Sequence, residues 1–442
     1  MRLLTTYYFP WYHGNAILPY IMSQFIIQGG KLLTGEIAVH GAKNHATKIL
    51  PASLLFKDAI TLMRVPHVED TLRLRELLEA VGCKTEEKTA GTLRITPVTH
   101  IATHELPRSI AERIRTSVLF VGPLLARTGR AQFPHPGGCV IGKRPIDMFL
   151  DGWRAMGAKI KENTAGFDIQ AKELHGIEYT FRSISHTATE GLMITAVLVK
   201  GKTTLRNAAR EPEVTALAEF LNSAGAVIRG AGTSTITIQG NNRNLLKGIT
   251  ASIIPDRLEA GSFAILAALL GNHVRITQCE PQHLEVLLAH LRAAGASIEE
   301  GTDWISVSRA RRLLPINIHT HEYPGSATDY QAPFTVLLTQ AHGQAMVFET
   351  IFEGRLAYLE DLNRMGARIT QCDLHRAIVF GPSKLRGRNL ESPDLRAGIA
   401  FVIAALVARG ASRIGNVYQI DRGYEKLDER LRGIGADITR EQ

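Results

Sequence analysis

The chain has 442 residues, of which 45% are apolar and 21% are charged, as in ordinary globular proteins. It contains no run of about 18 or more apolar residues, so we expect no membrane-spanning segment. The net charge is +9, but Lys and Arg are dispersed rather than clustered. This distribution favours small anionic ligands over nucleic acid.

Residues 1–21 differ from the rest of the chain. They are aromatic, contain one Arg and lack the small-residue cleavage site of a secretory signal peptide. We interpret this extension either as a mis-set translation start or as a disordered arm. The first strand is expected directly after Met22. The four cysteines form no CxxC pair, which favours a reducing compartment and predicts a cytoplasmic protein.

The central feature of the sequence is a repeat. Six segments that end in an amphipathic helix read LLEAVGCKT, WRAMGAKIK, LNSAGAVIR, LRAAGASIE, LNRMGARIT and LRGIGADIT. Their central glycines lie 68 to 75 residues apart, and each is expected to end its helix in the left-handed conformation. A second, mostly apolar helix recurs in every unit, for example residues 111–126 and 394–408, and its composition predicts a buried helix.

Six units of about 70 residues exceed what one hydrophobic core holds, which favours two α/β domains of three units each. The chain is expected to cross between the domains near 42 and near 254. The predicted domains are therefore 22–42 plus 255–442 and, between them, 43–254. A six-unit solenoid is the structural alternative.

Polar residues gather at two phases of the repeat. At the start of the buried helices stand Lys43, Asn44, Arg115, Thr189, Glu190, Asp256, Arg257, Asp329, Asp394 and Arg396. At the start of the amphipathic helices stand Cys139, Arg144, Arg210, Glu211, Arg355 and Arg422. Helix N-termini attract anions, so several of them facing one cleft would form a cationic pocket.

Cys139 is unusual because it follows Gly137 and Gly138 and precedes the cationic pair Lys143 and Arg144. Fixed positive charge stabilises a thiolate, so we expect a reactive thiol here. The glycines predict a loop that closes over substrate as a lid. The other three cysteines, at 83, 279 and 372, are interpreted as small buried apolar residues.

The strings GAKN, PGGCVIGKRPID, NAAREPE, PDRLEAGSF, TDYQA, DLRA and IDRGYE occur in this order on the repeat. Together they resemble the enolpyruvyl transferases, in particular the branch that acts on UDP-N-acetylglucosamine. The resemblance runs from Met22 to the C-terminus. It implies two inside-out α/β barrel domains of three units each. It also implies transfer of the enolpyruvyl group of phosphoenolpyruvate to the 3-hydroxyl of UDP-N-acetylglucosamine, with release of phosphate by addition and elimination.

The resemblance assigns roles to residues of this chain. It implies that Cys139 is the proton donor toward C3 of phosphoenolpyruvate and the target of fosfomycin, and that Asp329 is the base for the sugar hydroxyl. The implied phosphoenolpyruvate ligands are Lys43, Asn44, Arg144, Arg355 and Arg422, of which Lys43 and Arg422 are also catalytic. The implied UDP-sugar contacts are Asn44, Arg115, Arg144, Pro145, Ile146, Asp147, Met148, Ser183, Ile184, Ser185, His186, Asp329 and Ile351. Asp394 and Arg396 are supporting residues, although Asp394 is equally well explained as a plain helix cap.

The chain departs from the resemblance at four positions that leave the catalytic groups intact, namely Lys143, Thr187, Ala327 and Gly354. The resemblance implies no metal and no organic cofactor. The expected partners are the two small-molecule substrates, without nucleic acid or membrane, and the reaction is the first committed step of peptidoglycan synthesis. Two alternatives stay open, namely an enzyme that acts on 3-phosphoshikimate and a catalytically silent UDP-sugar-binding paralogue.

Overall fold

The computed structural model describes residues 23–137 and 146–442, and the strands of this part form six small sheets with a common plan. In five sheets an edge strand runs parallel to its neighbour, and two antiparallel strands follow. In the sixth, the edge strand is reduced to a parallel bridge between Glu105 and Gln132. The six sheets correspond to the six predicted units.

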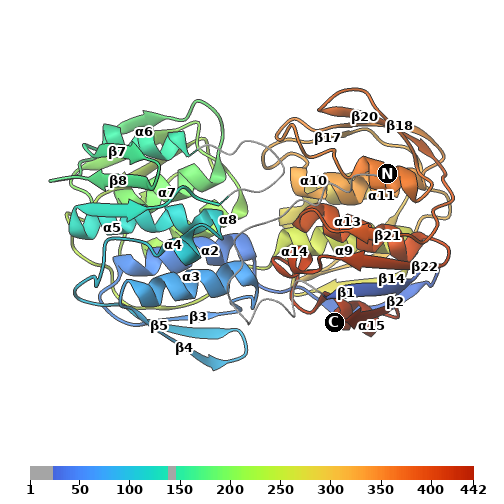
Figure 1. The fold of residues 1–442 in the computed structure, drawn as a ribbon, viewed down its shortest axis with the longest axis horizontal. Helices are drawn as coiled ribbons and strands as arrows, with labels where there is room; N and C mark the ends of the chain where they lie inside the picture. Colours follow the sequence, from blue (N-terminus) through green and yellow to red (C-terminus); the bar gives the residue numbers. More distant parts are fainter. Residues whose placement is uncertain (1–22, 138–145) are drawn as a thin grey trace, which may run out of the picture.

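The sheets are divided equally between two lobes that lie side by side (Figure 1). The central lobe, residues 42–253, contains β13 (Thr250–Ser252), β3 (Ile60–Met63), β5 (Thr92–Thr96) and β4 (Lys84–Thr89); β6 (Arg130–Phe133), β8 (Gly166–Gln170) and β7 (Lys159–Asn163); and β9 (Glu178–Thr180), β10 (Lys202–Arg206), β12 (Thr235–Gln239) and β11 (Val227–Arg229). The terminal lobe combines residues 23–40 with residues 257–442. It contains β2 (Leu33–Ala38), β14 (Gly271–Thr277), β16 (Trp304–Ser308) and β15 (Ser297–Glu300); β17 (Ile318–His319), β18 (Gly343–Phe348), β20 (Arg376–Gly381) and β19 (Arg368–Gln371); and β21 (Asn389–Glu391), β22 (Ala411–Gly415), β1 (Gln24–Gln28) and β23 (Asp437–Glu441).

The helices fall into the two predicted classes. The buried class is α2 (Lys43–Ala52), η2 (Arg115–Phe120) with α5 (Val121–Thr128), α7 (His186–Ala196), α9 (Arg257–Leu270), η4 (Thr328–Tyr330) with α11 (Gln331–Thr339), and α13 (Leu395–Val407). The class that precedes the repeated glycines is α3 (Glu69–Ala80), α6 (Asp147–Ala155), α8 (Pro212–Ser223), α10 (Glu285–Ala293), α12 (Leu359–Arg364) and α15 (Leu427–Gly433). Short helices occur at η1 (Ser53–Leu55), α4 (Arg108–Ala111), η3 (Pro281–Leu284) and α14 (Tyr418–Asp421).

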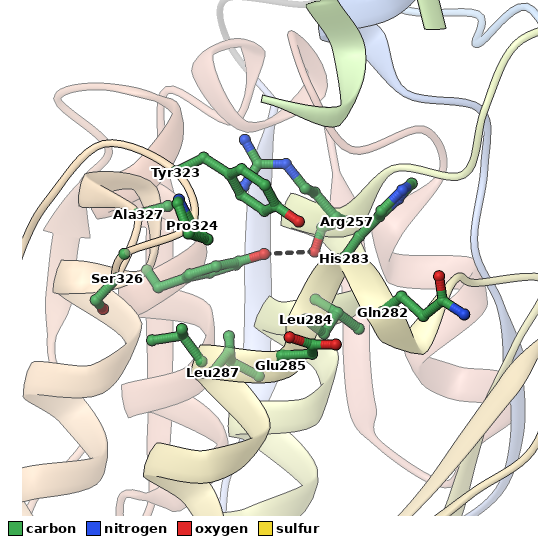
Figure 2. A pocket seen from close by; sticks show the side chains of 13 residues that line it. Arg257, Gln282, His283, Leu284, Glu285, Leu287, Tyr323, Pro324, Ser326 and Ala327 are labelled. Atoms are coloured by element: carbon green, nitrogen blue, oxygen red, sulfur yellow. Dashed lines mark hydrogen bonds between the residues drawn. The ribbon is translucent and has the colours of Figure 1, made fainter. Parts of the chain in front are cut away.

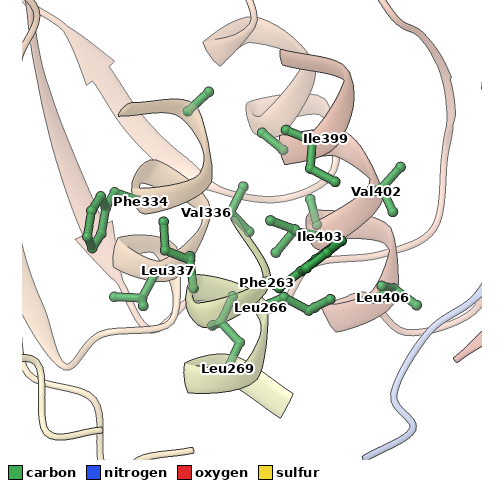
Figure 3. Packing of buried hydrophobic residues seen from close by; sticks show 14 of the residues in the cluster. Phe263, Leu266, Leu269, Phe334, Val336, Leu337, Ile399, Val402, Ile403 and Leu406 are labelled. Carbon is green, nitrogen blue, oxygen red and sulfur yellow. The ribbon is translucent and has the colours of Figure 1, made fainter. Parts of the chain in front are cut away.

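Each lobe has its own hydrophobic core, and the two cores share no residue. One core draws on positions 42–253, and the other on positions 25–39 and 258–438. In the terminal lobe, α9, α11 and α13 pack against one another with their apolar side chains interdigitated (Figure 3). Every residue of α9 is buried, because this helix is apolar around its whole circumference. The helices lie inside and the sheets outside, which is the inside-out α/β arrangement. The exact domain boundaries expected above stay a prediction.

The repeated glycines end their helices as expected. Gly82, Gly157, Gly225, Gly295, Gly366 and Gly435 have φ between 95° and 106°. A residue with a β-carbon is disfavoured in this left-handed region. The backbone N–H groups that follow return to the helix, as in the bonds from Gly82 to the Glu79 carbonyl and from Cys83 to the Leu78 carbonyl. The glycine spacing in the sequence therefore marks a real structural period.

One expected helix is broken. Residues 111–126 were expected to form a single buried helix, but the chain forms α4, η2 and α5 in succession. Ile114 takes an extended conformation with φ −130° and ψ 135°, and the Ser117 hydroxyl donates to the carbonyls of Ala111 and Ile114. A serine hydroxyl that binds nearby backbone competes with helical hydrogen bonding, which accounts for the interruption.

The interpretation of the cysteines is partly wrong. Cys83 and Cys279 are buried, as expected, but Cys372 is exposed in the turn after β19. Cys139 lies outside the described residues, as does the N-terminal extension. None of the helices in residues 23–137 and 146–442 combines the length and hydrophobicity that a membrane span requires.

The chain crosses between the lobes at two adjacent segments. Gly41 and Pro255 form an antiparallel bridge, and the Ala42 N–H donates to the Ile254 carbonyl at 2.7 Å. The buried His45 on α2 accepts a hydrogen bond from the Ile254 N–H through Nδ1. Burial lowers the pKa of His45 to about 4, with Glu213 opposing the shift and Lys48 adding to it. A neutral His45 thus ties α2 to the second crossing.

Because the pKa of buried His45 is lowered, we expect the free energy of unfolding to depend on pH. In the unfolded chain a histidine takes up a proton below about pH 6.5, whereas folded His45 stays neutral down to about pH 4. The unfolded state therefore binds more protons in this window, so stability is lost as the pH falls from 6.5 to 4. The loss is about 3 kcal/mol. Replacing the histidine by Asn keeps an acceptor but removes the titration.

We therefore expect the melting temperature of the wild-type chain to fall more steeply between pH 7 and pH 4 than that of His45→Asn. The exposed His100 provides the control, because His100→Asn should follow the wild-type curve. Parallel curves for the wild type and His45→Asn would show that His45 is not the proton-binding group.

Candidate active site

The site is built where the two crossings place helix N-termini from both lobes together. Asp256 caps α9, because its Oδ1 accepts hydrogen bonds from the N–H groups of Leu258 and Glu259. Its Oδ2 accepts the N–H of Lys43, the first residue of α2, at 3.1 Å. One carboxylate therefore satisfies the N-termini of two helices that belong to different lobes.

A second carboxylate joins two of the predicted cations across the junction. Asp70, in the first turn of α3, lies 3.1 Å from Lys43 Nζ and 3.3 Å from Arg422 Nε. Lys43 belongs to the central lobe, whereas Arg422 follows α14 in the terminal lobe. The two cations therefore meet on one acid that is only 8% exposed.

Charge and burial make this group receptive to an anion. Burial lowers the pKa of Lys43, and the attraction of Asp70 opposes that shift. The guanidiniums of Arg422 and Arg396 lower the pKa of Lys43 further. Burial alone would raise the pKa of Asp70, but Lys43 and Arg422 hold it below its ordinary value. Positive charge therefore exceeds what Asp70 neutralises, and a bound anion would relieve the repulsion.

The third acid, Asp329, is held by Arg396. The Arg396 Nε donates to Asp329 Oδ1 at 2.7 Å, and the Asp329 side chain remains 28% exposed. Burial alone would raise the pKa of Asp329, but Arg396 and Arg355 outweigh it and hold the pKa far below its ordinary value. Asp329 is therefore ionised throughout the physiological range.

Arg396 is positioned from several sides. Its backbone N–H donates to Asp394 Oδ1 at 2.7 Å, which makes Asp394 the N-cap of α13. Its guanidinium also donates to the Tyr424 hydroxyl at 3.2 Å. The carboxylate of Asp394 thus acts as a helix cap, and Arg396 is the residue of the DLRA string that contacts Asp329.

A buried ion pair closes the junction. Arg257 Nε contacts both carboxylate oxygens of Glu213, at 3.1 and 3.3 Å, and both side chains are less than 10% exposed. Arg257 lies on α9 in the terminal lobe and Glu213 on α8 in the central lobe. We call the whole group the charged seam. It comprises Lys43, Asp70, Glu213, Asp256, Arg257, Asp329, Arg396 and Arg422.

Arg355 reaches the edge of the charged seam through a hydroxyl. Its Nη1 donates to Thr328 Oγ1 at 2.9 Å, directly before Asp329 in the chain. Of the predicted anion ligands in the described residues, Lys43, Arg355 and Arg422 therefore lie at or beside the charged seam. Asn44 follows Lys43 on α2 and is partly exposed.

The predicted UDP-sugar residues form a second group within the central lobe. Asp147 at the start of α6 is paired with Arg182, and the Ser183 hydroxyl lies 3.8 Å from the Met148 sulfur. Ser185 caps α7 by accepting the Ala188 N–H. The structure thus brings together the 146–148 and 183–186 segments. Met148 and Ser183, which are in contact, are 35 residues apart in the sequence.

The remaining residues expected to contact the UDP-sugar are Arg115 and Ile351, together with residues that the structure does not describe. Arg115 begins η2, and Ile351 follows β18 in the terminal lobe, where its N–H donates to Glu349. Cys139, Arg144 and Pro145 lie outside the described residues, as does the departure at Lys143. Their roles, and the predicted lid, therefore stay predictions from the sequence.

Of the described departures, two are accounted for locally. The Thr187 hydroxyl lies 3.3 Å from the His186 ring, within the turn that begins α7. Ala327 precedes η4 in an extended conformation, a backbone that does not require proline. Nothing in the structure explains Gly354.

A surface pocket lies beside the charged seam on the terminal lobe (Figure 2). The Tyr330 hydroxyl donates to the Arg257 carbonyl at 2.7 Å, and the Arg257 guanidinium lies 5.4 Å from the centre of the Tyr323 ring. Of the residues expected to bind or catalyse, none lines it. The described residues expected to bind phosphoenolpyruvate lie at or beside the charged seam rather than in this pocket. Among the described residues no group of three or more His, Cys, Asp or Glu side chains is suited to a metal ion.

Sequence reasoning named Asp256 and Asp329 but missed three other acids beside the cations, namely Asp70, Glu213 and Glu349. Asp70 begins an amphipathic helix, the phase at which other units carry Arg. The repeat therefore offered a signal for Asp70. Glu213 ends the NAAREPE string, but its partner Arg257 is 44 residues away and was not assigned to it. Glu349 belongs to none of the quoted strings.

Because Asp70 pairs with both Lys43 and Arg422, we expect the protein to lose stability when the Asp70 carboxylate is removed. Asp70→Asn leaves Lys43 and Arg422 without their shared counter-charge. Breaking a buried pair in this way costs about 3 kcal/mol, so we expect a lower melting temperature at low ionic strength. Inorganic phosphate should restore more stability in the variant than in the wild type. The exposed pair Lys31–Asp437 is the control, since Asp437→Asn should cost at most about 1 kcal/mol. Equal losses in the two variants would contradict the assignment.

The chain matches a known family model, and its fold is similar to that of solved structures. The family model described as EPSP synthase (3-phosphoshikimate 1-carboxyvinyltransferase) matches residues 27–431. The fold is similar to that of the enolpyruvyl transferase NikO from Streptomyces tendae, with a TM-score of 0.86 at 24% identity over 95% of this chain and 99% of that one. An EPSP synthase from Acinetobacter baumannii gives a TM-score of 0.74 at 19% identity over 95% of this chain and 100% of that one.

Curated relatives are more similar in sequence. A UDP-N-acetylglucosamine 1-carboxyvinyltransferase of Solibacter usitatus is 44% identical over 95% of this chain and 100% of its own length. The enzyme of the same name from Desulforapulum autotrophicum is 43% identical over 95% of this chain and 100% of its own length. UDP-N-acetylglucosamine 1-carboxyvinyltransferase 2 of Bacillus anthracis is 41% identical over 95% of this chain and 97% of its own length. The chain therefore belongs to the enolpyruvyl transferase family, in the branch of the UDP-N-acetylglucosamine 1-carboxyvinyltransferases.

Proposed function

We propose that the protein transfers the enolpyruvyl group of phosphoenolpyruvate to the 3-hydroxyl of UDP-N-acetylglucosamine and releases phosphate. The observation that carries the proposal is the 41–44% identity, over 95% of the chain, to relatives named for this reaction. The charged seam supports it, because the seam offers the cations that a phosphate and a carboxylate require. We further propose that the protein acts in the cytoplasm, at the first committed step of peptidoglycan synthesis.

The proposed donor site uses cations from both lobes. Lys43 comes from the central lobe, whereas Arg355 and Arg422 come from the terminal lobe. Arginine binds forked anions such as carboxylate and phosphate through two parallel hydrogen bonds, and lysine acts as a point charge. Asp70 holds Lys43 and Arg422 near one another before the anion arrives. Binding then adds an anion to two cations that are already adjacent, which limits the reorganisation required.

The proposed acceptor site centres on Asp329. Arg396 donates to Oδ1, and the proposed acceptor of the sugar 3-hydroxyl is Oδ2. A carboxylate whose pKa is this low is a weak base. Its main contribution is therefore to orient the hydroxyl toward C2 of phosphoenolpyruvate. It accepts the proton as the new C–O bond forms, when the hydroxyl itself becomes acidic.

The proposed reaction has two stages. In the addition, the sugar oxygen bonds to C2, Asp329 takes the hydroxyl proton and Cys139 donates a proton to C3. In the elimination, the Cys139 thiolate takes a proton back from C3, the double bond returns and the C2–O bond to phosphate breaks. The proton held by Asp329 leaves with the phosphate, so both side chains regain their starting states. The cations stabilise the phosphate as it departs with its negative charge. Cys139 and Arg144 enter this account through the sequence resemblance alone.

The proposed nucleotide site is the group formed by residues 146–148 and 183–186. It presents the N-terminus of α7, capped by Ser185, with the His186 ring beside it. A helix N-terminus favours the negative charge of a diphosphate. The contacts made there are remote from the reacting atoms, so their binding energy can hold the acceptor in register with Asp329.

Two other functions are less well supported. An enzyme that uses 3-phosphoshikimate is suggested by the description of the matching family model, but the EPSP synthase structure is 19% identical, against 44% for the first UDP-sugar relative. A silent binding paralogue would not require the complete set of Lys43, Asp329, Arg396 and Arg422. One assay distinguishes all three.

We expect phosphate release from phosphoenolpyruvate to depend on UDP-N-acetylglucosamine. The measurement is a coupled phosphate assay with the full chain and three arms, namely UDP-N-acetylglucosamine, shikimate 3-phosphate and no acceptor. Turnover should occur in the first arm alone. Equal or faster turnover with shikimate 3-phosphate would overturn the acceptor. A lack of turnover in all arms, together with calorimetric binding of UDP-N-acetylglucosamine, would indicate the silent paralogue.

A further inference from the structure

Glu349 is a fully buried carboxyl group that the proposed reaction does not use. It directly follows β18, and both its backbone N–H and its backbone carbonyl contact a single residue, His375. Its N–H donates to the His375 carbonyl at 2.7 Å, and the His375 ring lies 2.7 Å from the Glu349 carbonyl. The position of this carboxyl group is therefore set by the sheet.

The side chain of Glu349 gathers two separate segments. Its Oε1 accepts the N–H groups of Ile351 and Phe352, at 2.9 and 3.2 Å. Its Oε2 accepts the hydroxyl of Thr328 at 2.8 Å. The Thr328 oxygen in turn accepts the guanidinium of Arg355 at 2.9 Å. One carboxyl group thus connects the start of η4 to the 351–355 segment.

Three residues of the proposed site depend on this connection. Asp329 directly follows Thr328, Arg355 binds the Thr328 hydroxyl, and Ile351 donates its N–H to the carboxyl group. Because the Arg355 guanidinium can only donate and the Glu349 carboxylate can only accept, the Thr328 hydroxyl accepts from Arg355 and gives its own hydrogen to Glu349. The direction of each hydrogen bond is therefore fixed by the presence of a carboxylate acceptor at Glu349.

We propose that Glu349 is a positioning residue that, through Thr328, sets Arg355 and Asp329 in the geometry needed for phosphoenolpyruvate and the sugar hydroxyl. This inference rests on the proposed function. Glu349 touches neither substrate, and its effect is transmitted by the Thr328 hydroxyl. Because burial raises the pKa of Glu349 while the hydrogen bond from Thr328 opposes the shift, the hydroxyl also helps to keep the carboxyl group ionised.

The test uses two near-isosteric changes. Glu349→Gln keeps an oxygen for the two N–H groups but presents an amide donor to Thr328, which reverses the hydrogen bond. Thr328→Val removes the hydroxyl while keeping the side-chain shape. Thr328→Ser is the control, because it keeps the hydroxyl. KM for each substrate and kcat are measured for the wild type, the three single variants and the Glu349→Gln/Thr328→Val double variant.

We expect Thr328→Val to raise KM for phosphoenolpyruvate about tenfold and to lower kcat, with KM for UDP-N-acetylglucosamine changed less than about twofold. Thr328→Ser should behave as the wild type does. The double variant should lose no more than the worse single variant, since both changes break the same connection. Wild-type kinetics in Thr328→Val, or losses that multiply in the double variant, would overturn the proposal.

A second readout does not depend on turnover. Amide hydrogen exchange is measured over residues 349–355 in the wild type and in Glu349→Ala, which removes the acceptor of the Ile351 and Phe352 N–H groups. Exchange should rise about tenfold or more in the variant, and unchanged exchange would overturn the connection. If the wild type shows no turnover while exchange responds as expected, the proposed function fails and the structural connection stands.

Discussion

The junction between the two lobes is organised around the carboxylate of Asp256. Its two oxygens cap α9 and α2, which begin in different lobes. Backbone bonds from Ala42 and Asp256 pair the two chain crossings beside it. Because a helix leaves its first N–H groups unsatisfied, a single buried acid at this point fixes where both helices start. The side chains that follow, Lys43 on α2 and Arg257 on α9, are thereby placed at the junction of the lobes.

The charged seam follows from this constraint. Helix starts carry partial positive charge and here also carry cationic side chains, so the junction would repel itself without acids. Asp70, Glu213 and Asp329 each hold a cation, and in the first two cases the ion pair spans both lobes. The cost of burying these charges is offset only when they are paired. The cations of the charged seam are therefore already held in place by acids, which is the electrostatic preorganisation that the proposed departure of phosphate requires.

The sequence was a good guide to the fold and a partial guide to the site. The glycine period is local, since each glycine ends one helix, so the six units and the buried helices could be predicted from residue patterns. The interruption at Ser117 could not, because it depends on which carbonyls the hydroxyl reaches. Lys43, Arg396 and Arg422 could be singled out by their phase in the repeat. Their acidic partners are separated from them by 27 to 352 residues, as with Asp70 and its two cations or Arg396 and Asp329. Such pairings emerge only when the sheets bring the helix starts together.

The central claim is that cations from both lobes share one anion site organised by Asp70. A crystal structure of the protein with phosphoenolpyruvate, in the absence of any acceptor, tests this claim most directly. The account predicts that one ligand molecule is held by Lys43 of the central lobe and Arg422 of the terminal lobe together, with both side chains still adjacent to Asp70. A ligand bound by residues of one lobe alone, with both ion pairs to Asp70 unchanged, would contradict it.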